Sequence, residues 1–375
     1  MRSTLSRAPV RSSARSDLLE RQFKRYCPHH QGAVRALASR HSRIADLALS
    51  FPSLLFALAA PRHGFDPAWP IARTIAGARL AEVAAAADVP MWLRRLPPEA
   101  LVRPIGRLPD SKPFRLQIAN HLPPRKLAPI WLGAVADAAE LADDAFAIWI
   151  AREMVRDMRS VKLKRLRLVG LWAWFSGQPG TFAGSLMRKC WTPDIQFEAA
   201  LAAADDWHDT ILLYVNLGRE PITDLWLRPA HVCGYDFRPL VSVSEIADEA
   251  LAMSNCVRRY GEDVAHNRSR LWSVRKDGQR AATLDVALCA GGPLPGVVQL
   301  KGAANSKAPF EVWWAARQWL NLHDLSRFDP KLKAWGSANP DRATWLALWR
   351  PYWLAKRRFP EWLPLAPALT PFKRL

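Results

Sequence analysis

Residues able to carry chemistry gather in four short segments between positions 253 and 305. The first segment holds Asn255, Cys256 and Tyr260, and a cysteine thiolate is a strong nucleophile when a neighbouring base or cation stabilises it. Asn255 cannot act as that base, and His266 follows only ten residues later. The sequence therefore disfavours cysteine catalysis and leaves the segment with a binding or a packing role.

Helical spacing gives this first segment two interpretations. Met253, Cys256, Tyr260 and Val264 are separated by three or four residues, so on one continuous helix they share a face. That face is either part of the hydrophobic core, with Cys256 as a small apolar residue, or one wall of a polar cleft.

The other segments are predicted to supply the remaining walls of such a cleft. Thr283 and Asp285 alternate on a predicted strand, so their side chains point to one face. Arg275 is expected across a hairpin from them, either in a surface ion pair of roughly 0–1 kcal/mol or in a buried polar network. The candidate pocket comprises Asn255, Cys256, Tyr260, Arg275, Thr283, Asp285, Gln299 and Asn305.

Residues 302–305 offer a second, weaker candidate, a turn whose backbone amides accept a phosphate. Lys301 and Lys307 flank this turn and would add positive charge. The segment has neither the Walker spacing nor a GxGxxG pattern, so it lacks the signatures of the well-known nucleotide-binding loops.

The elements that must position these residues form an α+β module. Ser244 is a suitable N-cap for a helix reaching about residue 266, and acids follow it in the first turns. Asp277-Gly278 is a strong hairpin signal between two β-prone runs, and Pro309 suits the first position of a closing helix. The predicted antiparallel strands are 271–276, 279–288 and 296–301.

Motifs across residues 249–305 resemble the PcfJ-like domain family of conjugative plasmids, phages and bacterial genomes. They are Met253-Ser-Asn-Cys256-Val257 with Tyr260, Ser273-Val-Arg275, Thr283-Leu-Asp285-Val286, and Gln299-Leu-Lys-Gly302-Ala-Ala-Asn305. The family usually has histidine where this chain has Asn255, and glutamate where it has Asp285. The resemblance implies a mobile-element context and the handling of DNA, and it implies no reaction.

We predict four parts along the chain. Residues 1–17 form a disordered basic arm, whose composition also resembles a transit peptide, and 18–240 form a mostly helical region. The α+β module occupies 241–323, and a basic segment rich in tryptophan and proline occupies 324–375. Within the helical region, helices are expected at 71–87, 129–155 and 194–216, and a proline-rich connector at 93–124.

The charge balance points to anionic partners. The chain has 53 basic and 34 acidic residues among 375, a net charge of +19. Cation strips bind phosphate backbones without reading sequence, although many such runs are simply solvated helix faces. The candidate nucleic-acid contacts are Arg152, Arg156, Arg159, Lys162, Lys164, Arg165, Arg167, Lys301, Lys307, Arg357 and Arg358. Arg156, Arg159 and Lys162–Lys164 are expected to form a strip of cations along one helix.

The 18 tryptophans suggest packing in the core for most positions. We assign Trp313, Trp314 and Trp319 to the core. Trp349 and Trp353 lie four residues apart beside arginines, so they are expected either to pack or to stack on exposed bases. The tryptophan-rich C-terminal segment is also a candidate surface for a protein partner.

Several classes of protein are excluded or left open by the sequence. The five cysteines are widely spaced, which indicates reduced thiols, no metal site and, with the family resemblance, a bacterial cytoplasmic protein. The longest apolar stretch, 44–61, contains Asp46 and Pro52 and is too short to span a membrane. No cofactor motif is present.

The leading interpretation is a nucleic-acid-associated accessory protein, and the alternatives are an enzyme using the candidate pocket or a protein-interaction module. The oligomeric state stays open.

Overall fold

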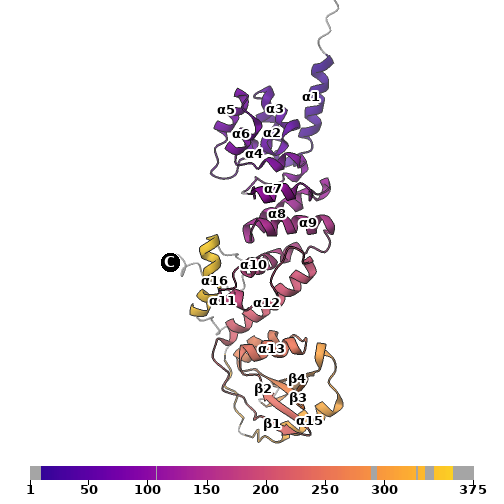
Figure 1. Ribbon diagram of the computed structural model, residues 1–375, viewed down its shortest axis with the longest axis vertical. Coiled ribbons are helices and arrows are strands. Elements are labelled where there is room, and N and C mark those ends of the chain that lie inside the picture. Colours follow the sequence, from indigo (N-terminus) through magenta and orange to yellow (C-terminus); the bar gives the residue numbers. More distant parts are fainter. Residues whose placement is uncertain (1–9, 107, 289–293, 327, 334–341, 358–375) are drawn as a thin grey trace, which may run out of the picture. The chain divides into compact units, whose positions relative to one another are not determined.

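The computed structural model describes residues 10–106, 108–288, 294–326, 328–333 and 342–357 (Figure 1). The chain divides into two compact units. Unit 1 comprises Met1–Trp174 and Trp191–Leu201, and unit 2 comprises Phe175–Cys190 and Ala202–Leu375. The division between the units thus falls inside the predicted helical region 18–240. In the residues described here, no helix combines the length and the apolar character needed to cross a membrane.

Unit 1 is built from helices, as the sequence predicts. Proline or a short polar side chain opens several of them, because either suits the first residues of a helix. Its helices are α1 (Val10–Phe23), α2 (Pro28–Ala38), α3 (Ser42–Ser50), α4 (Pro52–Ala59), α5 (Ala68–Ala76), α6 (Leu80–Ala86), α7 (Lys112–Ile118), α8 (Ala128–Leu141), α9 (Asp144–Arg156) and α10 (Leu166–Ser176), which runs on into unit 2.

Helix boundaries in unit 1 differ from the prediction at local stop signals. The expected helix 71–87 is divided at Gly77, whose φ of 82° ends α5 in the left-handed conformation. The expected helix 129–155 is divided where the Asp143 side chain accepts a hydrogen bond from the Phe146 amide at 2.8 Å and opens α9. The connector 93–124 contains α7, and α1 begins inside the arm for which disorder was predicted.

Unit 2 combines helices with one antiparallel sheet, which confirms the α+β fold class. The sheet has the order β1-β2-β3-β4-β5, so two short strands precede the three that were predicted. The strands are β1 (Ala230–Val232), β2 (Tyr235–Pro239), β3 (Ser269–Lys276), β4 (Gln279–Leu288) and β5 (Pro295–Lys301). The helices are α11 (Phe182–Ser185), α12 (Phe197–Leu217, which begins in unit 1), α13 (Val243–Ala252), α14 (Gly261–Ala265), α15 (Phe310–Asn321) and α16 (Arg342–Lys356).

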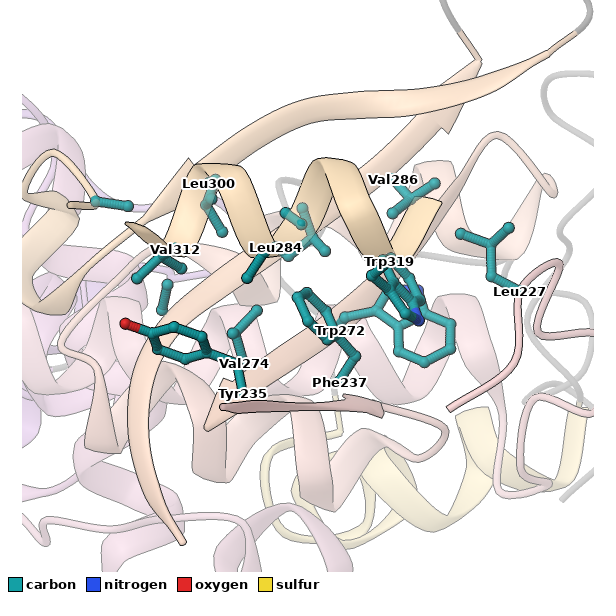
Figure 2. Packing of buried hydrophobic residues seen from close by; sticks show 14 residues of the cluster. Leu227, Tyr235, Phe237, Trp272, Val274, Leu284, Val286, Leu300, Val312 and Trp319 are labelled. Carbon is teal, nitrogen blue, oxygen red and sulfur yellow. The ribbon is translucent and has the colours of Figure 1, made fainter. Parts of the chain in front are cut away.

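One face of the sheet forms the apolar core beneath α15. Because side chains alternate along a strand, Trp272 and Val274 of β3 and Leu284 of β4 point to this face. Figure 2 shows them packed under the helix together with Trp319, whose ring stacks on Phe237 at a centroid distance of 4.7 Å. The inner side of α15 is therefore filled by contacts with the sheet.

The opposite face of the sheet carries a smaller apolar cluster and most of the polar residues of interest. Leu271 of β3 packs there with residues of α12, α13 and α14. The register places Asp285 opposite Gln299 and Thr283 opposite Lys301, so these four side chains share this face. The face is the floor of the candidate pocket.

The predicted single helix 244–266 is wrong, and a break in its middle shapes the pocket. Ser242, rather than Ser244, caps α13 in a reciprocal capping box with Glu245. Ser254 has a φ of 48°, a left-handed conformation that ends the helix and turns the chain. A 3-10 helix, η5 (Val257–Tyr260), and α14 follow. The proposed single face of Met253, Cys256, Tyr260 and Val264 on one helix therefore does not exist.

Tryptophans in α15 and α16 confirm some of these expectations and contradict others. Trp349 is 1% exposed and packs against the rings of Phe175 and Trp207, so of its two predicted roles packing is confirmed and stacking on bases is wrong. Trp345 is likewise buried, which contradicts a partner surface at this position. Trp313 and Trp314, which were assigned to the core, are 38% and 50% exposed.

Candidate functional site

A small pocket on the polar face of the sheet gathers seven of the eight residues singled out from the sequence. Its cavity of about 20 Å³ has room for a water-sized group. Leu271 and Asp285 are buried at its base, whereas Cys256 and Asn305 are exposed at its edge. The lining residues are Asn255, Cys256, Val257, Tyr260, Leu271, Thr283, Asp285, Gln299, Lys301 and Asn305.

Arg275 is the candidate that lies elsewhere. The pairing of β3 with β4 is interrupted by an irregularity between Val274 and Arg275, which brings Arg275 opposite Arg280. On its other side Arg275 pairs with Asp236 of β2, and its Nε donates to Ser273 Oγ at 3.2 Å. Arg275 therefore lies opposite Arg280 rather than directly opposite Thr283 or Asp285, and it does not line the pocket.

A chain of buried and half-buried hydrogen bonds ties the loop after α13 to the sheet. Asn255 Nδ2 donates to Thr283 Oγ1 at 2.8 Å, and the same hydroxyl donates to Glu249 Oε1 at 3.0 Å. The other carboxylate oxygen of Glu249 accepts from Arg280 Nε at 2.7 Å. Glu249 is fully buried, so its charge depends on these partners.

Two titratable groups in the pocket are shifted toward their neutral forms. Burial raises the pKa of Asp285, against the opposing effect of a hydrogen bond donated by Ser269 Oγ. Burial also raises the pKa of Tyr260, helped by the negative charge of Asp285 and opposed by a hydrogen bond with Gln299. Desolvation is thus the leading physical cause at both groups.

The thiol of Cys256 is reduced and exposed, and no histidine lines the pocket among the residues that the structure describes. His266 is buried away from it, with Nδ1 hydrogen-bonded to the Glu262 carbonyl at 2.8 Å. This arrangement agrees with the sequence argument against a cysteine–histidine pair. Within the described residues, no three or more His, Cys, Asp or Glu side chains cluster in a way that could hold a metal ion.

Two backbone amides of the turn at residues 302–305 are already bonded within the chain and are not free for a phosphate. The Ala304 amide donates to the Met253 carbonyl at 2.7 Å, and the Gly302 amide donates to the Ser306 carbonyl at 3.0 Å. The prediction of a phosphate-binding turn is therefore wrong for these amides. The exposed residues Lys301 and Lys307 face each other in a β-bridge next to it.

The second candidate site is the basic run after α9, and it is not the single helical strip that was expected. α9 ends at Arg156, and the chain then passes through a turn and a short 3-10 helix, Leu163–Arg165, before α10. Arg152 and Arg156 both contact Glu153, which is fully buried and also accepts from the Phe197 amide at 3.0 Å. These two arginines are part of the fold of unit 1.

The remaining cations form what we call the cationic loop, residues 159–167. Its five cations are exposed, and the segment contains no acid. Four of the five form no ion pair within the described part of the chain: Arg159, Lys162, Lys164 and Arg167. The nearest acid in sequence is Asp157, whose side chain accepts a hydrogen bond from the Arg159 backbone amide at 2.9 Å. The loop is anchored by the buried residues Val161 and Leu166.

The remaining candidates and several unforeseen residues complete the comparison with the sequence. Arg357 is exposed after α16, and Arg358 lies outside the described residues. Three residues that bond to the pocket were not singled out from the sequence: Glu249, Arg280 and Ser269. Glu249 offered a signal, because an acid on the buried side of a predicted helix indicates a buried partner.

Comparison with known proteins gives no further guide to the sites. No protein-family model matches the chain, and neither a curated protein nor a solved structure matches it.

Proposed function

We propose that the protein binds nucleic acid through the phosphate backbone, with the cationic loop as its principal contact. The observation that carries this proposal is the exposure of five cations in nine consecutive residues, four of which have no acidic partner in the described chain. Neutralising such cations with phosphates releases condensed counterions, which is the main source of affinity in binding that does not depend on sequence.

The position of the loop at a helix N-terminus strengthens the argument. The N-terminal end of a helix carries a partial positive charge, so Lys164 and Arg167 are repelled by α10, at whose start they lie. A cation placed there costs stability in the free protein, and a bound phosphate removes that cost because it interacts favourably with both the cations and the positive end of the helix dipole.

The distribution of charge between the units agrees with this assignment. Unit 1 contains 28 basic and 16 acidic residues, a surplus of 12, whereas unit 2 contains 25 and 18, a surplus of 7. Many arginines of unit 1 pair with acids, among them Arg25 with Glu99 and Arg73 with Glu82. The motifs at residues 249–305 that resemble the PcfJ-like family are the sequence-based reason for choosing DNA among the anionic partners.

The pocket supports the alternative of an enzyme less well. Its cavity of about 20 Å³ accepts a water-sized group, whereas pockets for small-molecule substrates are typically about 300–1,000 Å³. The hydrogen bonds of Asn255, Thr283 and Glu249 are made within the chain. These side chains therefore stabilise the module more directly than they recognise a ligand.

Fluorescence anisotropy with labelled single-stranded DNA, duplex DNA and RNA tests the proposal. The variant Arg159→Gln/Lys162→Gln/Lys164→Gln/Arg167→Gln should lose roughly one to three orders of magnitude in affinity at low salt, because it removes up to four phosphate contacts. The matched control is Arg21→Gln/Lys24→Gln/Arg40→Gln/Arg79→Gln. It lowers the net charge equally, at exposed positions that form no ion pair in the described chain.

The control variant should lose much less affinity than the loop variant. Equal losses in the two variants would mean that overall charge rather than the loop attracts the nucleic acid, and the assignment of the loop would be wrong. A wild-type protein that binds none of the three nucleic acids at low salt would refute the proposed function.

A further inference from the structure

The outer side of α15 presents three large aromatic side chains to solvent, which we call the aromatic face: Phe310, Trp313 and Trp314. They are 76%, 38% and 50% exposed. Phe310 lies three and four residues before the two tryptophans, so all three lie close together on the helix surface. Clusters of exposed aromatic residues on a folded domain commonly mark a binding site.

The core does not require these side chains. Val312, Ala315 and Trp319 already fill the space between the helix and the sheet (Figure 2). The inner side of α15 is thus fully packed against the sheet, and the aromatic face contributes only apolar surface that is exposed to solvent. Burying such area on a partner is favourable, whereas leaving it in water gives the free protein no benefit.

Cations lie at both ends of the aromatic face. Lys307, held beside Lys301 by a β-bridge, precedes Phe310, and Arg317 lies one turn beyond Trp313 and Trp314. Lys301, Lys307 and Arg317 are exposed and form no ion pair in the described part of the chain. Glu311 is the one acidic residue of α15.

We propose that the aromatic face binds single-stranded nucleic acid. Unpaired bases stack on Phe310 and Trp314, while Lys307 and Arg317 contact the flanking phosphates. The cations select an anionic occupant, and the rings select one that exposes flat π-faces; single-stranded nucleic acid has both properties. A duplex has its base faces already stacked and cannot use this surface in the same way.

This inference rests on the proposed function and deepens it. The cationic loop gives affinity for any phosphate backbone, and the aromatic face adds a preference for unpaired strands. The two contributions are separable because they come from different units and depend on different chemistry.

The test compares the affinities of labelled oligothymidine and of a duplex of equal length by anisotropy. Phe310→Ala/Trp314→Ala should lose roughly 5- to 150-fold in affinity for the single strand for each base-stacking contact that it removes. Its affinity for the duplex should not change. The control is Trp69→Ala, which removes a tryptophan that is 60% exposed on unit 1 and should leave both affinities unchanged.

A second pair of variants separates stacking from mere apolar burial. Trp314→Tyr keeps an aromatic ring and should retain single-strand affinity, whereas Trp314→Leu should lose it. Circular dichroism and thermal unfolding establish that all variants are folded, which is expected because the replaced side chains lie outside the core.

Three results would overturn the inference. One is an unchanged single-strand affinity in Phe310→Ala/Trp314→Ala, while the loop variant still loses binding; this leaves the proposed function intact. Another is an equal loss on both nucleic acids. The third is a loss of self-association in sedimentation without a change in single-strand affinity, which identifies the face as a protein contact. Absence of all nucleic-acid binding in the wild type refutes the proposed function as well.

Discussion

The polar pocket and the cationic loop are both rich in functional side chains, yet their interactions are opposite. In the pocket, Asn255, Thr283 and Glu249 are linked by hydrogen bonds and are largely removed from solvent. In the loop, Arg159 and Lys162 are exposed and form no ion pair within the described chain. Side chains satisfied by their own chain stabilise the fold, whereas exposed cations without acidic partners remain available to an external anion.

This difference predicts that pocket variants change stability and that loop variants change binding. Clear departures from that division would show that one of the two regions has been assigned the wrong role. The largest expected effect lies at the buried carboxylate of the pocket.

Glu249→Ala should lower the free energy of unfolding by roughly 3 kcal/mol. The substitution leaves Arg280 without its carboxylate and Thr283 without its acceptor, at a site where Glu249 is fully buried. Denaturant unfolding followed by circular dichroism measures the loss. Glu311→Ala, at an exposed acid of α15, is the control and should be nearly neutral. A loss below about 1 kcal/mol in Glu249→Ala would contradict the structural role of the network.

Thr283→Val should cost about 1–2 kcal/mol, because it keeps the shape of the side chain but removes the hydroxyl that joins Asn255 to Glu249. The same unfolding measurement applies, and the exposed Thr223→Val provides the comparison. Equal stabilities of the two variants would indicate that the shared hydroxyl contributes nothing.

Asp285→Asn should change the pH dependence of stability. Burial raises the pKa of Asp285 in the folded protein above its unfolded value, so the folded state binds more protons between the two pKa values. The stability of the wild type therefore falls as the pH rises from the pKa of Asp285 in the unfolded chain through its pKa in the folded protein. The asparagine variant lacks this decline, so its stability relative to wild type should increase with pH. A constant difference in unfolding free energy from pH 4 upward would contradict the shift.

The smallest effect is expected for the loop variant, in which Arg159, Lys162, Lys164 and Arg167 become glutamine. Its stability should stay the same or rise by about 0.3–1 kcal/mol, because two of these cations are repelled by the N-terminus of α10. Thermal and denaturant unfolding measure this change. A destabilisation of more than about 1 kcal/mol would show that these side chains hold the loop in place.

The sequence predicted the strands of the pocket well because their signals are local. Asp277 and Gly278 adopt φ values of 50° and 79°, as a two-residue hairpin turn requires, and the alternation of Thr283 and Asp285 fixed their common face. The strands β1 and β2 were missed because they are only three and five residues long. Their turn places Cys233 in the left-handed region, where cysteine gives no turn signal.

Tertiary packing decided what the sequence could not. Ser254 ends α13 in a left-handed conformation without any proline or glycine to announce it. Trp349 is buried because Phe175 and Trp207, far away in sequence, pack around it. Trp314 is exposed because Val312, Ala315, Ala316 and Trp319 already cover the sheet.

The salt dependence of duplex DNA binding tests the central claim most directly. For the wild type, the logarithm of the binding constant should fall steeply as the logarithm of the salt concentration rises. The slope should become shallower by up to about 3.6 in Arg159→Gln/Lys162→Gln/Lys164→Gln/Arg167→Gln, since each of the four phosphate contacts contributes about 0.9 to the slope. Identical slopes for this variant and the wild type would contradict the assignment of the loop as the phosphate-binding site.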